Sequence, residues 1–298
     1  MNHRYIVTLS ILFLSFILAF PGIAEYSDTS SIKNLDDRFS TMSIEPSYPN
    51  LSLRSASVLV EDQQTGEYLI EKHPDVIVPI ASITKLMTAM IILDARLNMK
   101  EKITITAEDV DKIRHSHSRL PVNTSLSRND ALLLALMSSE NRAAHALART
   151  YPQGLKAFVR AMNDKAQSLG LHETRFADPT GLSSENVSSA RDLARMVNAA
   201  YKYELIRDYT TRKEYLIRVG KRSLKFCNTN HLVRNPQWQI GLSKTGFIDE
   251  AGRCLVMQSK VAQRPVLIVL LDADGKMTRY GDANRIKKWM EESLAGDS

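Results

Sequence analysis

Strand-like segments lie at both ends of this chain and enclose a long helical region, and this order restricts the possible folds more than any other feature. Residues 55–61 and 66–71 flank a turn-rich insert and predict a β-hairpin. After the helical region, apolar strand patterns return at residues 214–219, 223–227, 239–246, 254–260 and 266–272. Hairpins at both ends indicate one antiparallel sheet, to which both ends of the chain must contribute.

The intervening residues, from about 106 to 208, show the spacing of apolar side chains that is typical of helices. Ser127, followed by Asp130, forms a capping box that opens one of them. Helices are predicted at residues 82–94, 131–137, 141–149, 154–169, 189–201 and 277–293. The predicted fold class is therefore α/β, with an antiparallel sheet flanked by helices and an inserted, mostly helical subdomain.

The N-terminus has the layout of a secretory signal peptide over residues 1–24. Arg4 precedes an almost wholly apolar stretch over 5–20, and Pro21 and Gly22 follow it. The alternative is an uncleaved membrane anchor, but the stretch falls short of the roughly 20 residues that span a bilayer, and Pro21 would end its helix. We therefore expect export, removal of the signal peptide and no stable transmembrane anchor.

The exported chain is predicted to have a polar tail over residues 25–52 and a single domain over 53–295. Within this domain, the sheet region would comprise 53–105 and 209–295, and the helical insertion 106–208.

Charge and cysteine content exclude several classes of protein. The 39 basic and 33 acidic side chains give a net charge of +6, but the basic ones are scattered, so no nucleic-acid partner is predicted. Two cysteines are too few for a disulfide scaffold or a Cys-rich zinc module. After export, Cys227 and Cys254 could form one disulfide or remain two buried free thiols, and the second interpretation is favoured.

Ser82 and Lys85, three residues apart at the start of an apolar helix, could form a nucleophile and its base. Such positions are neighbours on a helix, with Cβ atoms about 5–6 Å apart. A serine hydroxyl needs an adjacent base, and a lysine serves only if burial or nearby positive charge lowers its pKa. Ser82 could instead cap the helix, and Ser30 and Lys33 match the same pattern, but their surroundings are polar.

Ser139 and Asn141 lie between two predicted helices, where a packed scaffold would hold a hydroxyl and a carboxamide firmly. Such a pair can relay a proton and bind a substrate amide. The Ser-x-Asn pattern also occurs at 127–129, where the serine caps a helix, and at 184–186, in a Gly/Ser-rich turn. A helix–helix junction cap is the structural alternative for Ser139.

Lys244-Thr245-Gly246 occurs once, near the end of a predicted strand. Gly246 would let a substrate backbone approach closely, and Lys244 would bind a carboxylate and disfavour the protonated form of Lys85. Strand alternation places Thr245 on the face opposite Lys244, so its presence at the site requires a local twist. The structural alternative is a strand that ends in a turn.

In this order and behind an export signal, the three motifs together resemble those of the serine penicillin-recognising enzymes. Within that superfamily, the chain is similar to the low-molecular-mass penicillin-binding proteins that are D-alanyl-D-alanine peptidases. The resemblance covers about residues 53–290 and includes the segments 79–82, 176–182 and 251–253. It implies a serine β-lactamase/transpeptidase-like fold and a periplasmic location.

The resemblance also implies how the first two motifs act. Ser82 would be acylated by the penultimate D-alanine carbonyl of a peptidoglycan stem, with Lys85 as the proton acceptor. Ser139 would relay the proton to the leaving amine, and Asn141 would hold the peptide. Water would then release the acyl-enzyme, so neither a metal nor an organic cofactor is implied.

The remaining residues that the resemblance implies bind the substrate. Lys244 and Thr245 would hold its carboxylate, beside Gly246. The backbone N–H groups of Ser82 and Phe247 would form the oxyanion hole. β-Lactam antibiotics would acylate the same serine and inhibit the enzyme.

Three features resemble the soluble D,D-endopeptidases, which cut D-alanyl cross-links between peptidoglycan peptides. These are the short chain after the last strand and the segments 228–234 and 252–255. The alternatives are a D,D-carboxypeptidase that trims stem pentapeptides and a non-catalytic sensor of β-lactams or peptidoglycan. A β-lactamase is less favoured, because the chain has no Glu-x-x-Leu-Asn loop to supply a deacylating base.

Overall fold

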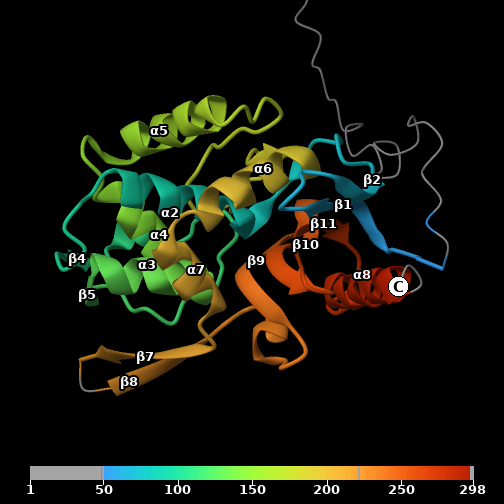
Figure 1. Ribbon diagram of the computed structural model, residues 1–298. Coiled ribbons are helices and arrows are strands. Elements are labelled where there is room, and N and C mark those ends of the chain that lie inside the picture. The colour runs from blue at the N-terminus through green and yellow to red at the C-terminus, as the bar shows by residue number, and fades with distance from the viewer. Residues whose placement is uncertain (1–47, 49, 221, 296–298) are drawn as a thin grey trace, which may run out of the picture.

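The computed structural model describes residues 48, 50–220 and 222–295, and the predicted signal peptide lies outside them. Its centre is an antiparallel five-stranded sheet with the order β2-β1-β11-β10-β9 (Figure 1). The strands are β1 (Ser55–Asp62), β2 (Tyr68–Lys72), β9 (Gln239–Ile248), β10 (Gly252–Val261) and β11 (Arg264–Ala273). Because β1 pairs with β11, the two ends of the chain share one sheet, which confirms the predicted fold class.

Six α-helices lie between the N-terminal hairpin and β9 in sequence, and one follows β11. They are α2 (Lys85–Asp94), α3 (Arg128–Met137), α4 (Asn141–Arg149), α5 (Gly154–Ser168), α6 (Ala190–Tyr201), α7 (Glu204–Thr211) and α8 (Thr278–Ala295). Short 3-10 turns occur at η1 (Ala81–Thr84), η2 (Ala107–Asp109), η3 (His231–Arg234) and η4 (Asp249–Ala251). The predicted helices are present, except that Ser82 lies in η1 rather than in α2, and α7 has no predicted counterpart. Ser127 caps α3 as predicted, because its Oγ accepts the N–H of Asp130 at 3.0 Å.

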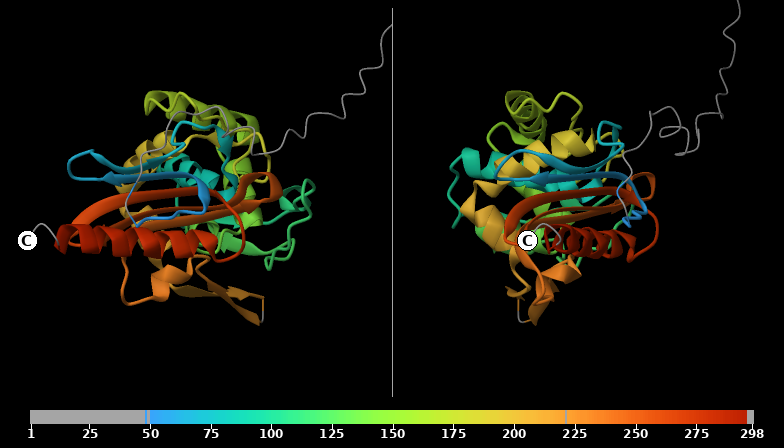
Figure 2. Two further views of the ribbon diagram at one scale, coloured as in Figure 1. Left: turned by 90° about the vertical axis from the view of Figure 1, so that its right-hand side faces the viewer. Right: turned by 45° about the vertical axis from the view of Figure 1, so that its right-hand side comes forward.

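Different helices cover the two faces of the central sheet, because successive side chains of a strand point to opposite faces. Val58 lies in one buried cluster with Ile286 of α8. Its neighbour Leu59 lies in the other cluster, with Leu193 of α6 and the rest of the helical region. Figure 2 shows α8 along one side of the sheet and the other helices on the opposite side.

Three small two-stranded sheets lie outside the central one. Their pairs are β3 (Val78–Pro79) with β6 (Val187–Ser188), β4 (Lys102–Thr104) with β5 (Ser125–Ser127), and β7 (Glu214–Val219) with β8 (Arg222–Cys227). The predicted strands β7 and β8 thus pair with each other and form an arm that projects from the body (Figure 1). Cys227, at the end of this arm's second strand, and Cys254, in β10, are both free thiols. The predicted burial holds for Cys254 and is wrong for Cys227, because β8 lies outside the central sheet.

In the part of the chain that the structure describes, no helix combines the length and the apolar character needed to cross a membrane.

Candidate active site

Ser82 lies in η1, the tight turn that leads into α2. The preceding residue, Ala81, has a φ of +46°, in the left-handed region that residues other than glycine rarely adopt. Two glycines pack against this turn. A Cβ atom at Gly181 would lie 1.9 Å from the carbonyl oxygen of Ala81, and one at Gly246 would lie 2.8 Å from that of Ile80. These close approaches fix the turn between β9 and the loop that carries Gly181.

Lys85 occupies the first turn of α2, directly beside Ser82. Its Nζ lies 2.8 Å from Ser82 Oγ, 2.7 Å from Asn141 Oδ1 and 2.6 Å from the carbonyl oxygen of Thr180. The lysine is only 1% exposed, and all three of these partners are neutral oxygen atoms. The structure therefore brings the two residues of the first motif together with the asparagine of the second.

The amine of Lys85 binds its proton weakly. Burial lowers its pKa from 10.5 to about 7, although nearby carboxylates, Asp178 first among them, act in the opposite direction. The predicted contribution of the positive charge of Lys244 is absent from the causes of this lowered pKa, and burial is the dominant one. Because a pKa near 7 leaves a substantial share of the amine uncharged at neutral pH, it can accept a proton from Ser82.

Ser139 follows α3 and has a φ of +60°. Its Oγ accepts a hydrogen bond from Nζ of Lys244 at 2.9 Å, and the same amine donates to the carbonyl oxygen of Thr245 at 3.0 Å. Lys244 is 1% exposed. Burial, and after it the positive charges of Lys85 and Arg279, hold the pKa of Lys244 well below its usual value. The second and third motifs therefore meet through a lysine–serine contact.

Asn141 begins α4, and both ends of its carboxamide are bound. Its Oδ1 accepts from Lys85, and its Nδ2 donates to Ser116 Oγ at 2.9 Å. The preceding residue, Glu140, caps the helix and accepts from Ser118 Oγ at 2.6 Å. These contacts fix the orientation of the carboxamide beside the amine of Lys85.

The predicted local twist at Thr245 is absent, and strand alternation is retained. Thr245 pairs with Leu255, which belongs to the buried cluster on the α8 side, whereas Lys244 pairs with Val256 of the opposite cluster. The hydroxyl of Thr245 donates to Thr229 Oγ1 at 2.6 Å instead of lying beside the amine of Lys244.

Thr229 connects three parts of the site, and the motifs did not identify it. It binds Thr245 through its hydroxyl, its N–H donates to Met137 O at 3.1 Å, and its carbonyl accepts from Tyr280 at 3.0 Å. Met137 lies two residues before Ser139. The resemblance of segment 228–234 to D,D-endopeptidases was the only sequence signal for this position.

Arg279 is a second residue that the motifs did not identify. Its guanidinium is 7% exposed and donates to the carbonyl oxygens of Gly246 at 2.9 Å and Cys254 at 3.3 Å. It thereby ties β9 to β10 and adds positive charge behind Lys244. Phe247, which follows Gly246 in β9, is 48% exposed.

The alternative matches to the motifs have structural roles or lie outside the described residues. Asn186 is buried, accepts from the N–H groups of Ala177 at 2.8 Å and Asp178 at 3.1 Å, and donates to Thr84 Oγ1 at 3.0 Å. It fixes the loop whose carbonyl oxygen, that of Thr180, accepts from Lys85. Ser30 lies outside the described residues.

Among the residues that the structure does describe, no three His, Cys, Asp or Glu side chains are grouped as a metal site would need.

Comparison with known proteins gives a consistent result. A family model described as D-alanyl-D-alanine carboxypeptidase matches residues 42–275. Over 241 residues, the chain is 51% identical to the D-alanyl-D-alanine endopeptidase of Pseudomonas aeruginosa and 48% identical to that of Escherichia coli, with 80% of this chain and 78% of each relative covered. The structure resembles the crystal structure of the Streptomyces K15 DD-transpeptidase, with a TM-score of 0.75 and 27% sequence identity. The match covers 83% of this chain and 98% of that one.

Proposed function

Because the chain belongs to the D-alanyl-D-alanine carboxypeptidase family of peptidases, we propose that it is a serine-type D-alanyl-D-alanine endopeptidase. It hydrolyses the D-alanyl cross-links of peptidoglycan in the periplasm. The observation that carries this proposal is the 2.8 Å contact between Ser82 Oγ and the amine of Lys85. Burial lowers the pKa of this amine to about 7. The choice of endopeptidase is supported by the names of the relatives to which the chain is about half identical.

In the first step, Lys85 accepts the proton of Ser82 while Ser82 Oγ attacks the carbonyl carbon of the D-alanine. The resulting ammonium has three protons, and three oxygen acceptors already surround Nζ, namely Ser82 Oγ, Asn141 Oδ1 and Thr180 O. The transferred proton is therefore held without rearrangement of the site. The backbone N–H groups of Ser82 and Phe247 stabilise the oxyanion, and loss of one such donor typically raises the barrier by about 3–4 kcal/mol.

In the second step, the amine of the cleaved bond leaves as it gains a proton from Ser139, and the proton that Lys85 took from Ser82 passes to Ser139, so that Lys85 is uncharged again when water attacks. The hydrogen bond from Nζ of Lys244 supports this role, because it holds the hydroxyl of Ser139 in the site. Lys244 also binds the carboxylate of the leaving half, with Gly246 allowing the peptide backbone to approach, and Thr245 supports this strand from the opposite face through its contact with Thr229. Water then attacks the acyl-enzyme and regenerates Ser82. Penicillin acylates the same hydroxyl.

The product released from defined muropeptides tests this proposal. Incubation with a cross-linked dimer should release monomers, and Ser82→Ala should leave the dimer intact. If the wild-type protein instead removes one D-alanine from a pentapeptide monomer and leaves dimers uncut, the protein is a carboxypeptidase. If neither substrate is changed while penicillin still binds, the sensor hypothesis replaces the enzyme.

A further inference from the structure

The arm formed by β7 and β8 is strongly basic, and the proposed mechanism does not use it. Between residues 212 and 227, Glu214 is the single acidic side chain. The basic side chains of this segment are Arg212, Lys213, Arg218, Lys221, Arg222 and Lys225. The segment therefore carries nearly all of the net charge of +6 that the whole chain has, and such a surface favours an anionic ligand.

Three of these basic side chains are exposed and, among the residues that the structure describes, have no ion pair. They are Lys213, Arg218 and Arg222. Lys225 pairs with Glu214 at 2.7 Å, but both side chains are about half exposed. An exposed pair of this kind is weak, so the lysine can exchange its partner for another carboxylate. The arm thus presents cations that the protein itself does not neutralise.

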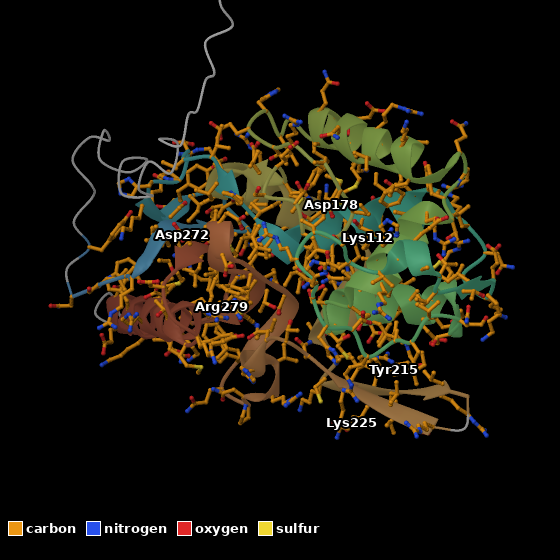
Figure 3. The ribbon with its side chains drawn as sticks, turned by 180° about the vertical axis from the view of Figure 1, so that it is seen from behind. Lys112, Asp178, Tyr215, Lys225, Asp272 and Arg279 are labelled. Atoms are coloured by element: carbon orange, nitrogen blue, oxygen red, sulfur yellow. The ribbon has the colours of Figure 1, made fainter. Side chains whose placement is uncertain are left out.

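One face of the arm is apolar and fixes the arm to the body. Tyr215 donates its hydroxyl to Asp130 at 3.0 Å, and the guanidinium of Arg119 lies 5.0 Å from the ring centre of Phe226. Figure 3 shows Tyr215 on the side of the arm that faces the body and Lys225 on the outer side. The basic side chains are therefore held along a fixed ribbon, because the six residues of β7 extend over about 20 Å.

The base of the arm borders the active site. β8 leads into Thr229, whose hydroxyl accepts from Thr245. Arg119, which donates to a backbone carbonyl of β8, belongs to the loop in which Ser116 accepts from Asn141. A polymer with one of its peptides in the site can therefore continue along the arm.

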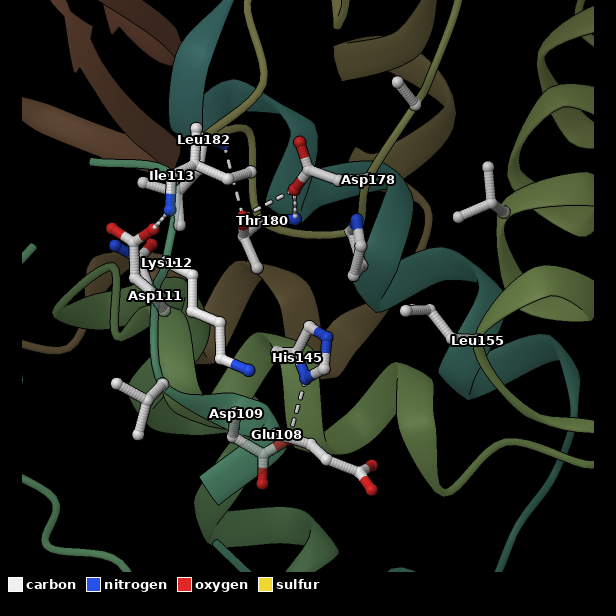
Figure 4. Close-up of a pocket in the computed structure, with 15 residues that line it drawn as sticks. Glu108, Asp109, Asp111, Lys112, Ile113, His145, Leu155, Asp178, Thr180 and Leu182 are labelled. Atoms are coloured by element: carbon white, nitrogen blue, oxygen red, sulfur yellow. Dashed lines mark hydrogen bonds and ion pairs between the residues drawn. The ribbon is translucent and has the colours of Figure 1, made fainter. Parts of the chain in front are cut away.

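Carboxylates gather on the other side of the helical region. The pocket between α4 and α5 is lined by Glu108, Asp109, Asp111 and Asp178, with Lys112 as the single lysine or arginine of its wall (Figure 4). Figures 1 and 2 show α5 and the arm on opposite sides of the helical region. The electrostatic potential of the two surfaces therefore favours the arm as the path of an anionic polymer.

We propose that the arm is a second binding surface for peptidoglycan, outside the active site. Lys213, Arg218 and Arg222 pair with ionised carboxylates of neighbouring stem peptides while one cross-link is cleaved. An anionic membrane is the other candidate, but Leu216, 64% exposed, is the one large apolar side chain that the described part of the arm exposes. So small an apolar area contributes little to binding a bilayer. This inference rests on the proposed function, because the polymer that it names is the proposed substrate.

Two substrates test this inference, intact peptidoglycan sacculi and a soluble cross-linked muropeptide dimer. Arg218→Gln combined with Arg222→Gln should lower the rate of cross-link cleavage in sacculi about five-fold, the effect expected from the loss of two exposed ion pairs. The value of kcat/KM for the dimer should not change, because these two residues lie at the end of the arm away from the site.

A matched control removes the same charge elsewhere. Lys202→Gln combined with Lys260→Gln changes two exposed lysines outside the arm that have no ion pair within the described residues, and it should retain the wild-type rate on sacculi. Co-sedimentation with sacculi, in a Ser82→Ala background, measures binding apart from cleavage. The arm variant should bind about five-fold more weakly than the control. At about 1 M NaCl, where charges are screened within about 3 Å, this difference should disappear.

The outcomes separate this inference from the proposed function. Unchanged cleavage and sedimentation of the arm variant would overturn the inference, as would an equal fall for the dimer or for the control variant. Arm-dependent binding to phosphatidylglycerol vesicles, with unchanged binding to sacculi, would assign the arm to a membrane instead. Cleavage of neither substrate by the wild-type protein would overturn the proposed function, and sedimentation would still decide whether the arm binds the polymer.

Discussion

The surroundings of Asp282 in α8 and of Lys85 in α2 lie on opposite sides of the central sheet and hold a buried ionisable group in opposite ways. On the α8 side, Asp282 is fully buried and accepts from the N–H and the hydroxyl of Ser55 at 2.7 and 2.6 Å, and it also pairs with Arg285. On the other side, Lys85 and Lys244 are equally buried but contact neutral oxygen atoms. A buried charge that is paired with an opposite charge holds the fold together. A buried amine without a counter-charge has a lowered pKa. The buried amine without a counter-charge is the group suited to catalysis.

The largest expected effect concerns Lys85. Lys85→Met should lower the rate of Ser82 acylation by penicillin roughly 10²–10⁴-fold, because the general base is lost. The melting temperature should fall less than in Asp282→Ala, because the variant leaves Asn141 Oδ1 and Thr180 O without this donor but also removes the cost of burying the amine. Stopped-flow kinetics and differential scanning fluorimetry measure the two quantities. A variant that acylates normally would show that another group takes the proton.

Replacement of the buried carboxylate of Asp282 should have the opposite effect, a loss of stability. Asp282→Ala should lower the free energy of unfolding by about 3 kcal/mol, because it leaves Arg285 and the donors of Ser55 without their buried partner. The exposed pair of Asp208 with Arg212 provides a control, and Asp208→Ala should cost less than about 1 kcal/mol. Urea denaturation measures both. Equal losses in the two variants would contradict the structural role of the buried carboxylate.

The low pKa of Lys85 predicts the pH dependence of acylation. Since this pKa lies near 7 instead of 10.5, the amine is protonated and inactive below pH 7 and becomes a base above it. The second-order rate constant for penicillin should therefore rise about ten-fold per pH unit below pH 7 and become constant above it. A rise that continues to pH 10 would mean that burial does not lower the pKa.

The smallest expected effect concerns Thr229, which supports the site from the edge of the sheet. Thr229→Val removes the acceptor for the hydroxyl of Thr245 and should lower kcat/KM about five-fold, which corresponds to about 1 kcal/mol for one hydrogen bond. Thr229→Ser keeps the hydroxyl and should restore the rate. If both variants lose activity equally, the side chain acts through packing instead.

The sequence predicted which segments form strands better than it predicted which strands pair with each other. Runs of apolar residues identified β1, β9, β10 and β11, because helices cover both faces of the central sheet and the side chains on both faces are buried. Apolar residues also identified β7 and β8, but such a pattern contains no information about which strand pairs with which. These two strands form a separate arm, and Cys227 is consequently exposed.

The site shows a similar division between local and distant information. Ser82 and Lys85 were recognisable because helical spacing alone makes them neighbours. Thr180 contributes a backbone carbonyl, and Arg279 acts from a helix at the other end of the chain, so no local pattern identifies either. Burial as the cause of the low lysine pKa also depends on how distant segments pack, and this is the information that the structure adds.

The central claim is that Ser82 is the nucleophile, and the position of a penicillin adduct tests it most directly. The protein is incubated with penicillin and digested, and the modified peptide is identified by mass spectrometry. We predict one adduct per chain, on the peptide that contains Ser82, and none after Ser82→Ala. An adduct on a different residue, or an adduct that persists in Ser82→Ala, would contradict the account.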